Sequence, residues 1–330
     1  MSVKQKIIMV LGPTAAGKTR FGVALAASLN GEIISADSRQ VYRGLDIGSG
    51  KDLSEYSLPG GNRVPCHLID VADPSEEYTL ADFLTDSSLA IDDICGRGRV
   101  PVVVGGTALY LHGLLCAYKL HGGAPDKAFR EELRARSTED LRTMLAGLDP
   151  ENGILRREPE NRTRLIRAIE FARGGDMTRA REPDLPLNRE YLILGVLRPR
   201  AEIRARIEAR LRERLERENM LGEAVRLHEQ GVSYERLEFL GLEYRSMALY
   251  LQGKTTETEM FDSLLAHIRQ FAKRQDSWFR KLERDGFPVY WLKPEETDRA
   301  AELARKFLAG GPLPEITFRL SGVNYGRQEK

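Results

Sequence analysis

The sequence predicts an α/β fold: a parallel β-sheet core flanked by helices, with a helical domain inserted into it. Short β-branched and apolar segments alternate with helix-length segments through the first third of the 330 residues, a pattern typical of a parallel, doubly wound sheet. A glycine-rich loop motif follows the first of these segments and precedes a helical pattern. After about residue 126 the sequence becomes helical and rich in Arg and Glu, until a strand-like segment returns.

Strands and helices can be placed by apolar periodicity and by capping residues. The expected strands are Ile7–Leu11, Glu32–Ser35, His67–Val71, Val100–Val104 and Tyr191–Leu197. Helices are expected after Lys18, at Thr79–Cys95, from Ala201 and from near Thr256 past Trp278. Thr79 with Asp82, and Thr256 with Glu259, have the spacing of capping boxes. These elements divide the chain into a core of residues 1–122 and 188–314, a helical insertion of residues 123–187, and a C-terminal tail, 315–330, without strong periodicity.

Composition sets limits on the class of protein. Fifty Lys and Arg against 49 Asp and Glu give a formal charge of +1, so a nucleic-acid partner would have to be bound by local patches. No apolar run approaches the ~20 residues that span a bilayer. The three cysteines are scattered, which supports neither a disulfide framework nor a zinc site and favours a reduced, cytoplasmic location. A monomer is expected, because no long apolar patch is evident.

The loop after the first expected strand fits the G-x-x-x-x-G-K-[ST] pattern of a P-loop. Its residues are Gly12, Pro13, Thr14, Ala15, Ala16, Gly17, Lys18 and Thr19. Backbone N–H groups of such a loop, with the positive end of the following helix, bind phosphates. Lys18 adds a positive charge, and the Thr19 hydroxyl is a candidate ligand for Mg²⁺. The motif therefore predicts a polyphosphate ligand but does not identify the molecule that carries it.

Asp37 is the carboxylate of greatest interest near this loop. P-loop kinases usually place a metal-binding acidic residue at the end of a neighbouring strand, but Val100–Val104 ends in Gly105-Gly106-Thr107. Asp37 directly follows a strand, where it could bind metal, act as a general base, or simply shape the loop as an Asx turn. Asp70, which ends another expected strand, could be structural or associated with metal.

Several stretches together resemble the tRNA dimethylallyltransferases, also called tRNA isopentenyltransferases, of the bacterial type. They occur in family order from about residue 7 to 281 and read GPTAAGKT, SADSRQVYRGLDIGSGK, HLIDVADPSEEYTLADF, VVVGGTALY, RLIRAIE, RIEAR and AKRQDSWFR. The P-loop alone is generic, but the combination is highly specific. Nothing resembles the zinc-finger extension of eukaryotic members.

The resemblance implies transfer of a dimethylallyl group from dimethylallyl diphosphate to N6 of adenosine 37 in the tRNA anticodon stem-loop, with Mg²⁺ as cofactor. Asp37 then matches the catalytic base, Thr107 a group near the bridging oxygen of the donor, and Arg206, with Arg210, a diphosphate clamp. Taken alone, the Arg206–Arg210 row would be a solvated ion-pair face. The residues implied in tRNA binding are Asp37, Ser38, Arg39, Gln40, Thr107, Arg130, Thr163, Arg164, Leu165, Ile166, Arg167, Tyr244, Arg245, Lys273, Arg274, Gln275, Trp278 and Arg280.

The chain departs from the family pattern at Glu243, which stands where a glycine usually precedes the Tyr-Arg pair, and mildly at Ser49-Gly50. Three other functions remain open on the residues alone. They are an adenylate isopentenyltransferase acting on free nucleotide, a small-molecule P-loop kinase, and an RNA-binding P-loop protein without catalysis. The Arg-rich insertion argues against the first, because a free nucleotide would not need it. The missing acidic strand end argues against the kinase. The intact Lys18 and Asp37 argue against a protein without catalysis.

Overall fold

The computed structural model describes residues 4–58, 60–116, 127–173 and 188–323, which belong to two compact units. Unit 1 combines Met1–Cys116 with Leu185–Lys330, and unit 2 is Ala117–Asp184. The predicted insertion, residues 123–187, overlaps unit 2, and the ends of both ranges lie outside the described residues.

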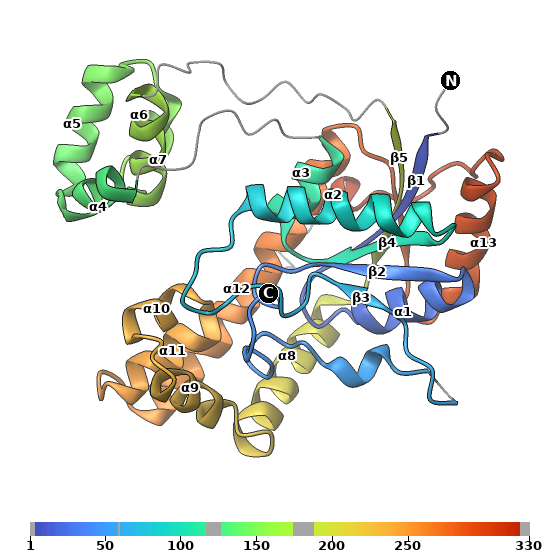
Figure 1. Cartoon of the computed structure of the whole chain (residues 1–330), viewed down its shortest axis with the longest axis horizontal. Coiled ribbons are helices and arrows are strands. Elements are labelled where there is room, and N and C mark those ends of the chain that lie inside the picture. Colours follow the sequence, from blue (N-terminus) through green and yellow to red (C-terminus); the bar gives the residue numbers. More distant parts are fainter. Residues whose placement is uncertain (1–3, 59, 117–126, 174–187, 324–330) are drawn as a thin grey trace, which may run out of the picture. The chain divides into compact units, whose positions relative to one another are not determined.

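Unit 1 contains a six-stranded sheet and the helices around it (Figure 1). Its strands are β1 (Gln5–Leu11), β2 (Gly31–Ala36), β3 (Cys66–His67), β4 (Val100–Gly105), β5 (Arg189–Val196) and β6 (Val289–Leu292). Its helices are α1 (Lys18–Ser28), α2 (Leu80–Gly96), α3 (Ala108–Leu115), α8 (Arg200–Glu216), α9 (Met220–Glu229), α10 (Tyr234–Phe239), α11 (Leu242–Leu251), α12 (Glu257–Arg284) and α13 (Thr297–Leu308), with the short 3₁₀ helices η1 (Leu53–Tyr56) and η2 (Leu320–Gly322).

The strands pair in the order β3-β2-β4-β1-β5-β6, and every neighbouring pair is parallel. The predicted parallel sheet is therefore confirmed. Leu11 of β1 and Ala36 of β2 both stand in register with Gly105 of β4. Because the carboxyl ends of these three strands lie at one edge of the sheet, the loops that follow them meet there.

Side-chain alternation along β1 explains how the sheet is covered on both faces. Ile8 and Val10 pack into a core with buried residues of α1 and α13, whereas Ile7, Met9 and Leu11 pack into a second core with residues of α2, α3 and α12. A strand that is buried on both faces reads as a continuous apolar run, which is how the sequence identified β1.

The helices α8 to α11 and the first part of α12 form a third core of their own. Ile203, Ile207 and Leu211 form an apolar row along α8, and all three are buried in this core. The loop after β2 contributes Val41, Tyr42 and Leu45 to the same core. This packing attaches the charged helix α8 to the loops at the edge of the sheet.

Unit 2 is described by four helices: α4 (Lys127–Ala135), α5 (Thr138–Leu148), α6 (Gly153–Arg157) and α7 (Arg162–Arg173). Its small core joins Leu133, Leu141 and Leu145 to the apolar side of α7. Leu165 and Ile166 belong to that core, with 0% and 9% of their surfaces exposed. Their side chains stabilise the helical unit, and their contact with tRNA stays a prediction.

Several expected elements need correction. The predicted strand His67–Val71 is reduced to Cys66–His67, because Leu68 and Asp70 have φ angles of +63° and +57° and leave the extended conformation. Strand β6 and helix α13 were not predicted. Both predicted capping boxes are present, at Thr79–Asp82 and at Thr256–Glu259.

The predicted C-terminal tail, residues 315–330, is attached to α12 in its described part. Glu283 of α12 is 5% exposed and accepts hydrogen bonds from the backbone N–H groups of Leu320 and Ser321, at 3.1 and 2.6 Å. The same carboxylate accepts a 2.7 Å bond from Trp291 Nε1. Leu320 is buried beside it. Residues 324–330 lie outside the described part of the chain.

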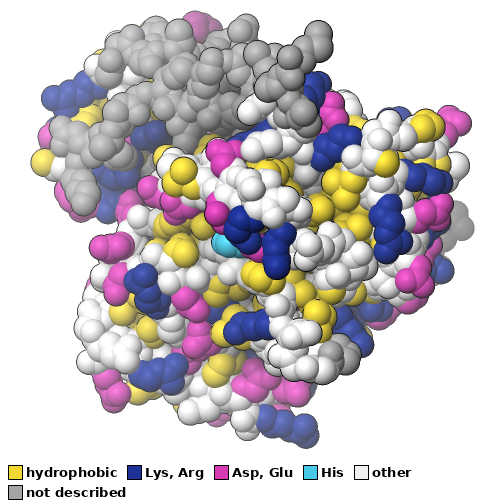
Figure 2. Space-filling model, turned by 45° about the vertical axis from the view of Figure 1, so that its right-hand side comes forward, with side chains coloured by type: hydrophobic (Ala, Val, Ile, Leu, Met, Phe, Trp, Pro, Cys, Tyr) yellow, Lys and Arg dark blue, Asp and Glu magenta, His cyan; other side chains and the backbone are white. Residues whose placement is uncertain are grey.

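The surface carries both signs of charge. On the face in Figure 2, Lys and Arg are interspersed with Asp and Glu rather than gathered into one basic region, in keeping with the net charge of +1. Among the described residues, no helix combines the length and apolarity needed to cross a membrane.

Candidate active site

The P-loop lies between β1 and α1, where its sequence predicted it. The loop passes so close to β5 that a Cβ atom at Gly12 would lie 2.7 Å from the carbonyl oxygen of Val196. Glycine is therefore required for this close backbone approach. Helix α1 begins at Lys18, so its first N–H groups and positive dipole end belong to the loop.

Two arginines hold the outer side of the loop through its carbonyl groups. Arg206 Nε donates to the oxygen of Ala15 at 2.9 Å, and Arg198 Nε donates to the oxygen of Ala16 at 3.0 Å. Arg206 comes from α8 and also lines the cavity described below. Fixing these carbonyl groups also fixes the orientation of the adjoining peptide planes.

Gln275 connects the P-loop to the turn after β4. Its Oε1 accepts from the Thr14 N–H at 2.8 Å, and its Nε2 donates to the Gly106 oxygen at 2.9 Å. The side chain is 5% exposed. Both ends of its amide are thus used inside the protein, and the contact of Gln275 with tRNA stays a prediction.

Lys18 stands in the loop with its Nζ 2.9 Å from the Pro13 carbonyl oxygen. Burial lowers the pKa of the Lys18 ammonium to about 8, and the negative charge of Asp37 partly opposes this shift. Burial disfavours the charged form of an amine, and an anion bound in the loop would stabilise the charged ammonium.

Asp37 begins the turn after β2. Its Oδ1 accepts from the backbone N–H groups of Arg39 at 2.8 Å and Gln40 at 3.4 Å. The Asx turn is therefore present, but it uses only one oxygen. Within the described chain, Oδ2 has no hydrogen-bond partner, and Asp37 lines the cavity. The same carboxylate can thus shape the turn and accept a proton.

Thr107 supports this turn rather than the helix that it precedes. Its Oγ1 accepts from the Ser38 N–H at 3.0 Å, and its side chain makes no capping bond to α3. Neither Thr107, Ser38 nor Arg39 is among the residues that line the cavity. Gln40 does line it, but this side chain is 9% exposed and is engaged by Ser35 and by the Gly50 carbonyl.

These loops enclose one polar cavity of about 410 Å³. Lys18 and three arginines of α8, Arg206, Arg210 and Arg214, supply positive charge to its wall. The P-loop residues on it are Thr14, Ala15, Gly17, Lys18 and Thr19, and the carboxylates on it are Asp37, Asp52, Glu55, Glu213, Glu218 and Glu243. Such a wall suits an anion at the P-loop end and a hydrogen-bonding group beside Asp37.

Arg210 and Arg214 are linked by Asp52, which forms ion pairs with both. Arg214 is 8% exposed, and burial lowers the pKa of its guanidinium, as does the neighbouring charge of Arg210. Arg210 lies where the sequence predicted a cation for a diphosphate. Arg214 continues the same row of α8 by one turn and also lines the cavity.

Glu243, the departure from the family pattern, lies in the first turn of α11 and on the cavity wall. Burial raises the pKa of its carboxyl group, whereas the charge of Arg214 lowers it. The next residue, Tyr244, is 1% exposed and donates to Glu223 at 2.6 Å. The Tyr244 side chain is therefore engaged inside the protein, and its contact with tRNA stays a prediction.

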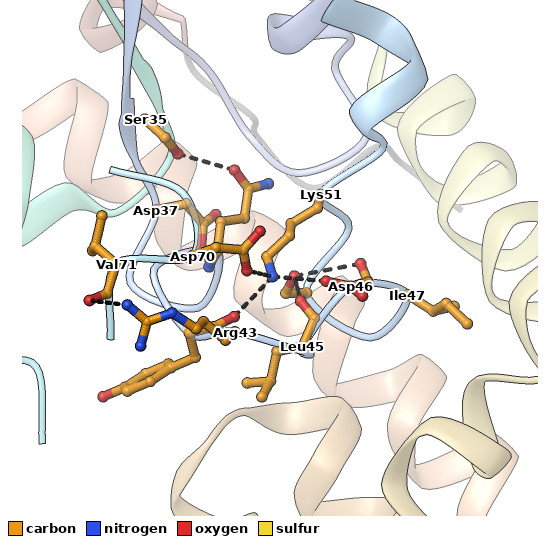
Figure 3. A network of polar contacts seen from close by, with 12 residues as sticks. Ser35, Asp37, Arg43, Leu45, Asp46, Ile47, Lys51, Asp70 and Val71 are labelled. Atoms are coloured by element: carbon orange, nitrogen blue, oxygen red, sulfur yellow. Dashed lines mark hydrogen bonds and ion pairs between the residues drawn. The ribbon is translucent and has the colours of Figure 1, made fainter. Parts of the chain in front are cut away.

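Lys51 and Asp70 form a structural contact beside the cavity (Figure 3). The Lys51 ammonium is 1% exposed and is held by Asp46 at 2.8 Å, by Asp70 and by the carbonyl oxygen of Tyr42 at 2.8 Å. Asp70 is thus occupied by an ammonium group, which favours the structural alternative left open by the sequence.

The remaining residues predicted to bind tRNA differ in exposure. Arg245, Lys273, Arg274, Thr163 and Arg164 are exposed. Three others are partly buried and engaged within the protein: Arg130 pairs with Glu170 at 2.6 Å, Arg280 donates to Val323 at 2.9 Å, and Trp278 stands edge-on to Phe279. Arg167 also pairs with Glu170, at 3.1 Å. The exposed residues are the ones that retain the accessibility a macromolecular contact requires.

The protein offers few groups for a metal ion, which favours a metal coordinated mainly by the phosphate oxygens of a bound substrate. Among the described residues, no cluster of three or more His, Cys, Asp or Glu side chains could hold a metal ion by itself. Thr19 offers a hydroxyl on the cavity wall. Mg²⁺ in phosphate sites commonly takes one or two protein oxygens, with substrate phosphate oxygens and water completing six ligands, and this site fits that mode.

Similarity to known proteins covers almost the whole chain. A family model described as IPP transferase matches residues 40–282, and one described as isopentenyl transferase matches residues 5–68. "tRNA dimethylallyltransferase 1" of Syntrophus aciditrophicus (strain SB) is 41% identical over 302 residues, covering 90% of this chain and 97% of the relative. "tRNA dimethylallyltransferase 1" of Geotalea uraniireducens (strain Rf4) is 46% identical over 292 residues, covering 87% and 92%.

A solved structure gives the same result. The crystal structure of the full-length tRNA isopentenylpyrophosphate transferase from Bacillus halodurans matches with a TM-score of 0.65 at 35% sequence identity. The match covers 93% of this chain and 96% of that chain. The overall fold is thus shared with a solved relative over almost the whole chain.

Proposed function

Because this chain belongs to the IPP transferase family, we propose that it transfers a dimethylallyl group from dimethylallyl diphosphate to N6 of adenosine 37 in tRNA, next to the anticodon. Relatives 41% and 46% identical to it are tRNA dimethylallyltransferases, and the chain is an enzyme of this class. One observation carries the chemical proposal: the P-loop, three arginines and Asp37 line a single cavity. The product would be N6-(dimethylallyl)adenosine, with diphosphate released.

The reaction breaks the allylic C–O bond of the donor and forms a bond between its first carbon and adenine N6. The electron pair of the broken bond leaves with the diphosphate, so negative charge grows there while the carbon becomes positive. N–H groups at the start of α1, Lys18 and the arginines of α8 are placed to stabilise that growing charge. No phosphoryl group moves, which agrees with a strand β4 that ends in glycines rather than in a carboxylate.

Asp37 would accept the proton that N6 loses on alkylation. An amine conjugated with a purine ring is a weak nucleophile, and a base within about 3 Å assists its attack. The Asx turn fixes Oδ1 and the Thr107 hydroxyl fixes the next peptide, which leaves Oδ2 of this cavity-lining residue as the oxygen proposed to take the proton. The role of Thr107 that this geometry supports is thus to position the turn.

Mg²⁺ is proposed as the cofactor, held by the Thr19 hydroxyl together with the donor. When bound, it would neutralise charge on the diphosphate and so favour its departure. Lys18 and the arginines of α8 would neutralise the remaining charge of the diphosphate.

Adenosine 37 must leave its stack in the anticodon loop to enter the cavity, at a cost of a few kcal/mol. Exposed cations of α12, Lys273 and Arg274, and Arg245 of α11 are proposed to contact the RNA backbone. Thr163 and Arg164 of unit 2 are proposed to contact the anticodon arm as well. We propose that the enzyme works as a monomer in the cytoplasm, where its three free cysteines stay reduced.

A label-transfer assay tests this function against the alternatives. The protein is incubated with labelled dimethylallyl diphosphate and either unmodified tRNA or AMP, and separately with labelled ATP and the same acceptors. Prenyl label in tRNA is expected. Label in AMP alone would indicate an adenylate isopentenyltransferase, phosphate transfer from ATP would indicate a kinase, and binding without transfer would indicate an RNA-binding protein.

The lowered pKa of Lys18 predicts how donor affinity depends on pH. Below about pH 8 the ammonium is charged and favours the diphosphate, and above it the free enzyme loses that charge. The KM for dimethylallyl diphosphate should therefore rise from pH 8 to 9.5, where the donor is fully ionised and an ordinary lysine would still be charged.

Lys18→Arg is the matched control for this profile, because arginine remains protonated throughout the range. Whatever its absolute KM, the variant should lose the rise above pH 8. Parallel profiles for the wild-type protein and Lys18→Arg would mean that another group titrates.

A further inference from the structure

Glu223 of α9 is a fully buried carboxylate that binds three consecutive backbone N–H groups of another segment. Its Oε2 accepts from Asp46 at 2.9 Å and Ile47 at 2.8 Å, and its Oε1 accepts from Gly48 at 3.0 Å. Tyr244 adds a fourth bond, from its hydroxyl to Oε1 at 2.6 Å. The Glu223 side chain is 0% exposed, and its charge is balanced by these donors and by the guanidinium of Arg226, 3.9 Å from Oε2.

The segment that Glu223 binds, residues 46–52, forms part of the wall of the active site. Gly48, Ser49, Gly50 and Asp52 all line the cavity, whereas Glu223 does not. A Cβ atom at Gly50, where φ is +72°, would lie 2.7 Å from Nη2 of Arg214. The backbone of the segment thus lies directly against the guanidinium groups that are proposed to bind diphosphate.

Two connections lead from this segment to the reacting groups. Asp52 forms ion pairs with Arg210 and Arg214. The Gly50 carbonyl accepts a 3.0 Å bond from the side chain of Gln40, whose own N–H is bonded to Oδ1 of Asp37. A shift of the segment would therefore move both the arginines and the turn that carries Asp37.

We infer that Glu223 is a positioning residue for the transfer reaction. By binding the N–H groups of residues 46–48 from outside the cavity, it sets the distance between the diphosphate-binding arginines and Asp37. Lys51, at the other end of the segment, forms ion pairs with Asp46 and Asp70, so the segment is held by a buried anion and a buried cation. The inference rests on the proposed function, since the reaction defines the groups that must be aligned.

Glu223→Gln tests the inference with little change of volume. Each oxygen of Glu223 accepts two bonds, so an amide nitrogen in place of one oxygen loses two of the four and turns a donor toward other donors. We expect kcat/KM for dimethylallyl diphosphate to fall by about 10- to 100-fold, as is usual when reacting groups are displaced by about 1 Å, with tRNA affinity unchanged.

Glu283→Gln is the matched control. Glu283 is also a buried carboxylate that accepts three N–H groups, but it anchors residues 320 and 321 and does not line the cavity. Both variants should lower the melting temperature, and only Glu223→Gln should change the kinetics.

Each outcome then has one reading. A folded Glu223→Gln protein with wild-type kcat and KM would overturn the inference and leave Glu223 a structural residue. If that variant does not fold, Glu223→Asp decides: a lowered kcat/KM supports positioning, and wild-type kinetics contradict it. The wild-type assay keeps the two proposals apart, because absence of prenyl transfer by the unmodified protein would reject the function itself.

Discussion

Replacing Asp37 with asparagine is expected to lower kcat by about 10³-fold while tRNA binding remains, since general-base catalysis contributes about 10²- to 10⁴-fold. Asparagine keeps the Oδ1 oxygen that accepts from the Arg39 and Gln40 N–H groups, so the turn persists. It replaces Oδ2, the oxygen proposed to take the N6 proton, with a group that cannot accept one. Single-turnover transfer of labelled dimethylallyl to tRNA measures the loss.

Asp37→Ala separates the two roles of this carboxylate, because alanine removes both the turn oxygen and the base. Under the proposed mechanism, Asn and Ala variants should lose similar amounts of kcat, and Ala alone should lose additional stability. An active Asn variant beside an inactive Ala variant would show that Asp37 only shapes the turn.

Arg206→Ala is expected to raise the KM for dimethylallyl diphosphate by about 10- to 100-fold with a smaller change in kcat. The estimate corresponds to one hydrogen bond to a charged group, worth about 1.5–3 kcal/mol. Arg206 lines the cavity and also holds the P-loop through the Ala15 carbonyl, so its removal loses a cation and loosens the loop. Donor titrations at saturating tRNA give both constants.

Arg204→Ala is the control for this change. Arg204 lies on the same helix, carries the same charge and is exposed like Arg206, but it does not line the cavity. Its KM should match that of the wild-type protein. If both variants weaken the donor equally, the effect comes from net charge, and Arg206 returns to the solvated face that the helix pattern suggests on its own.

Much of the fold could be predicted because local patterns agree with the final structure. The apolar runs at β1 and β4 are buried on both faces, and the Thr79 and Thr256 caps mark true helix starts. Strand β6 was missed because its four residues, Val289–Leu292, become a strand through pairing with β5, a contact 96 positions away along the chain. The left-handed residues Leu68 and Asp70 likewise give no strong sequence signal.

At the P-loop and Asp37 the predicted residues line one cavity, because these positions follow strand ends. On α12 and α11 some of the predicted residues are buried, because a motif names residues without showing which way they face. Gln275 is spaced with the buried residues Ala272 and Phe279, so helical periodicity alone would have placed it inside. Glu223 gave no signal, because a buried glutamate that binds a distant loop looks like any glutamate on an amphipathic helix.

The most direct test of the central claim is a crystal structure of the protein with an unmodified anticodon arm and an unreactive thiolo analogue of dimethylallyl diphosphate. We predict the diphosphate within about 3 Å of the N–H groups at residues 17–19, and adenine N6 within about 3 Å of Oδ2 of Asp37. A diphosphate bound away from the P-loop, or an extruded adenine whose N6 faces no oxygen of Asp37, would contradict the account.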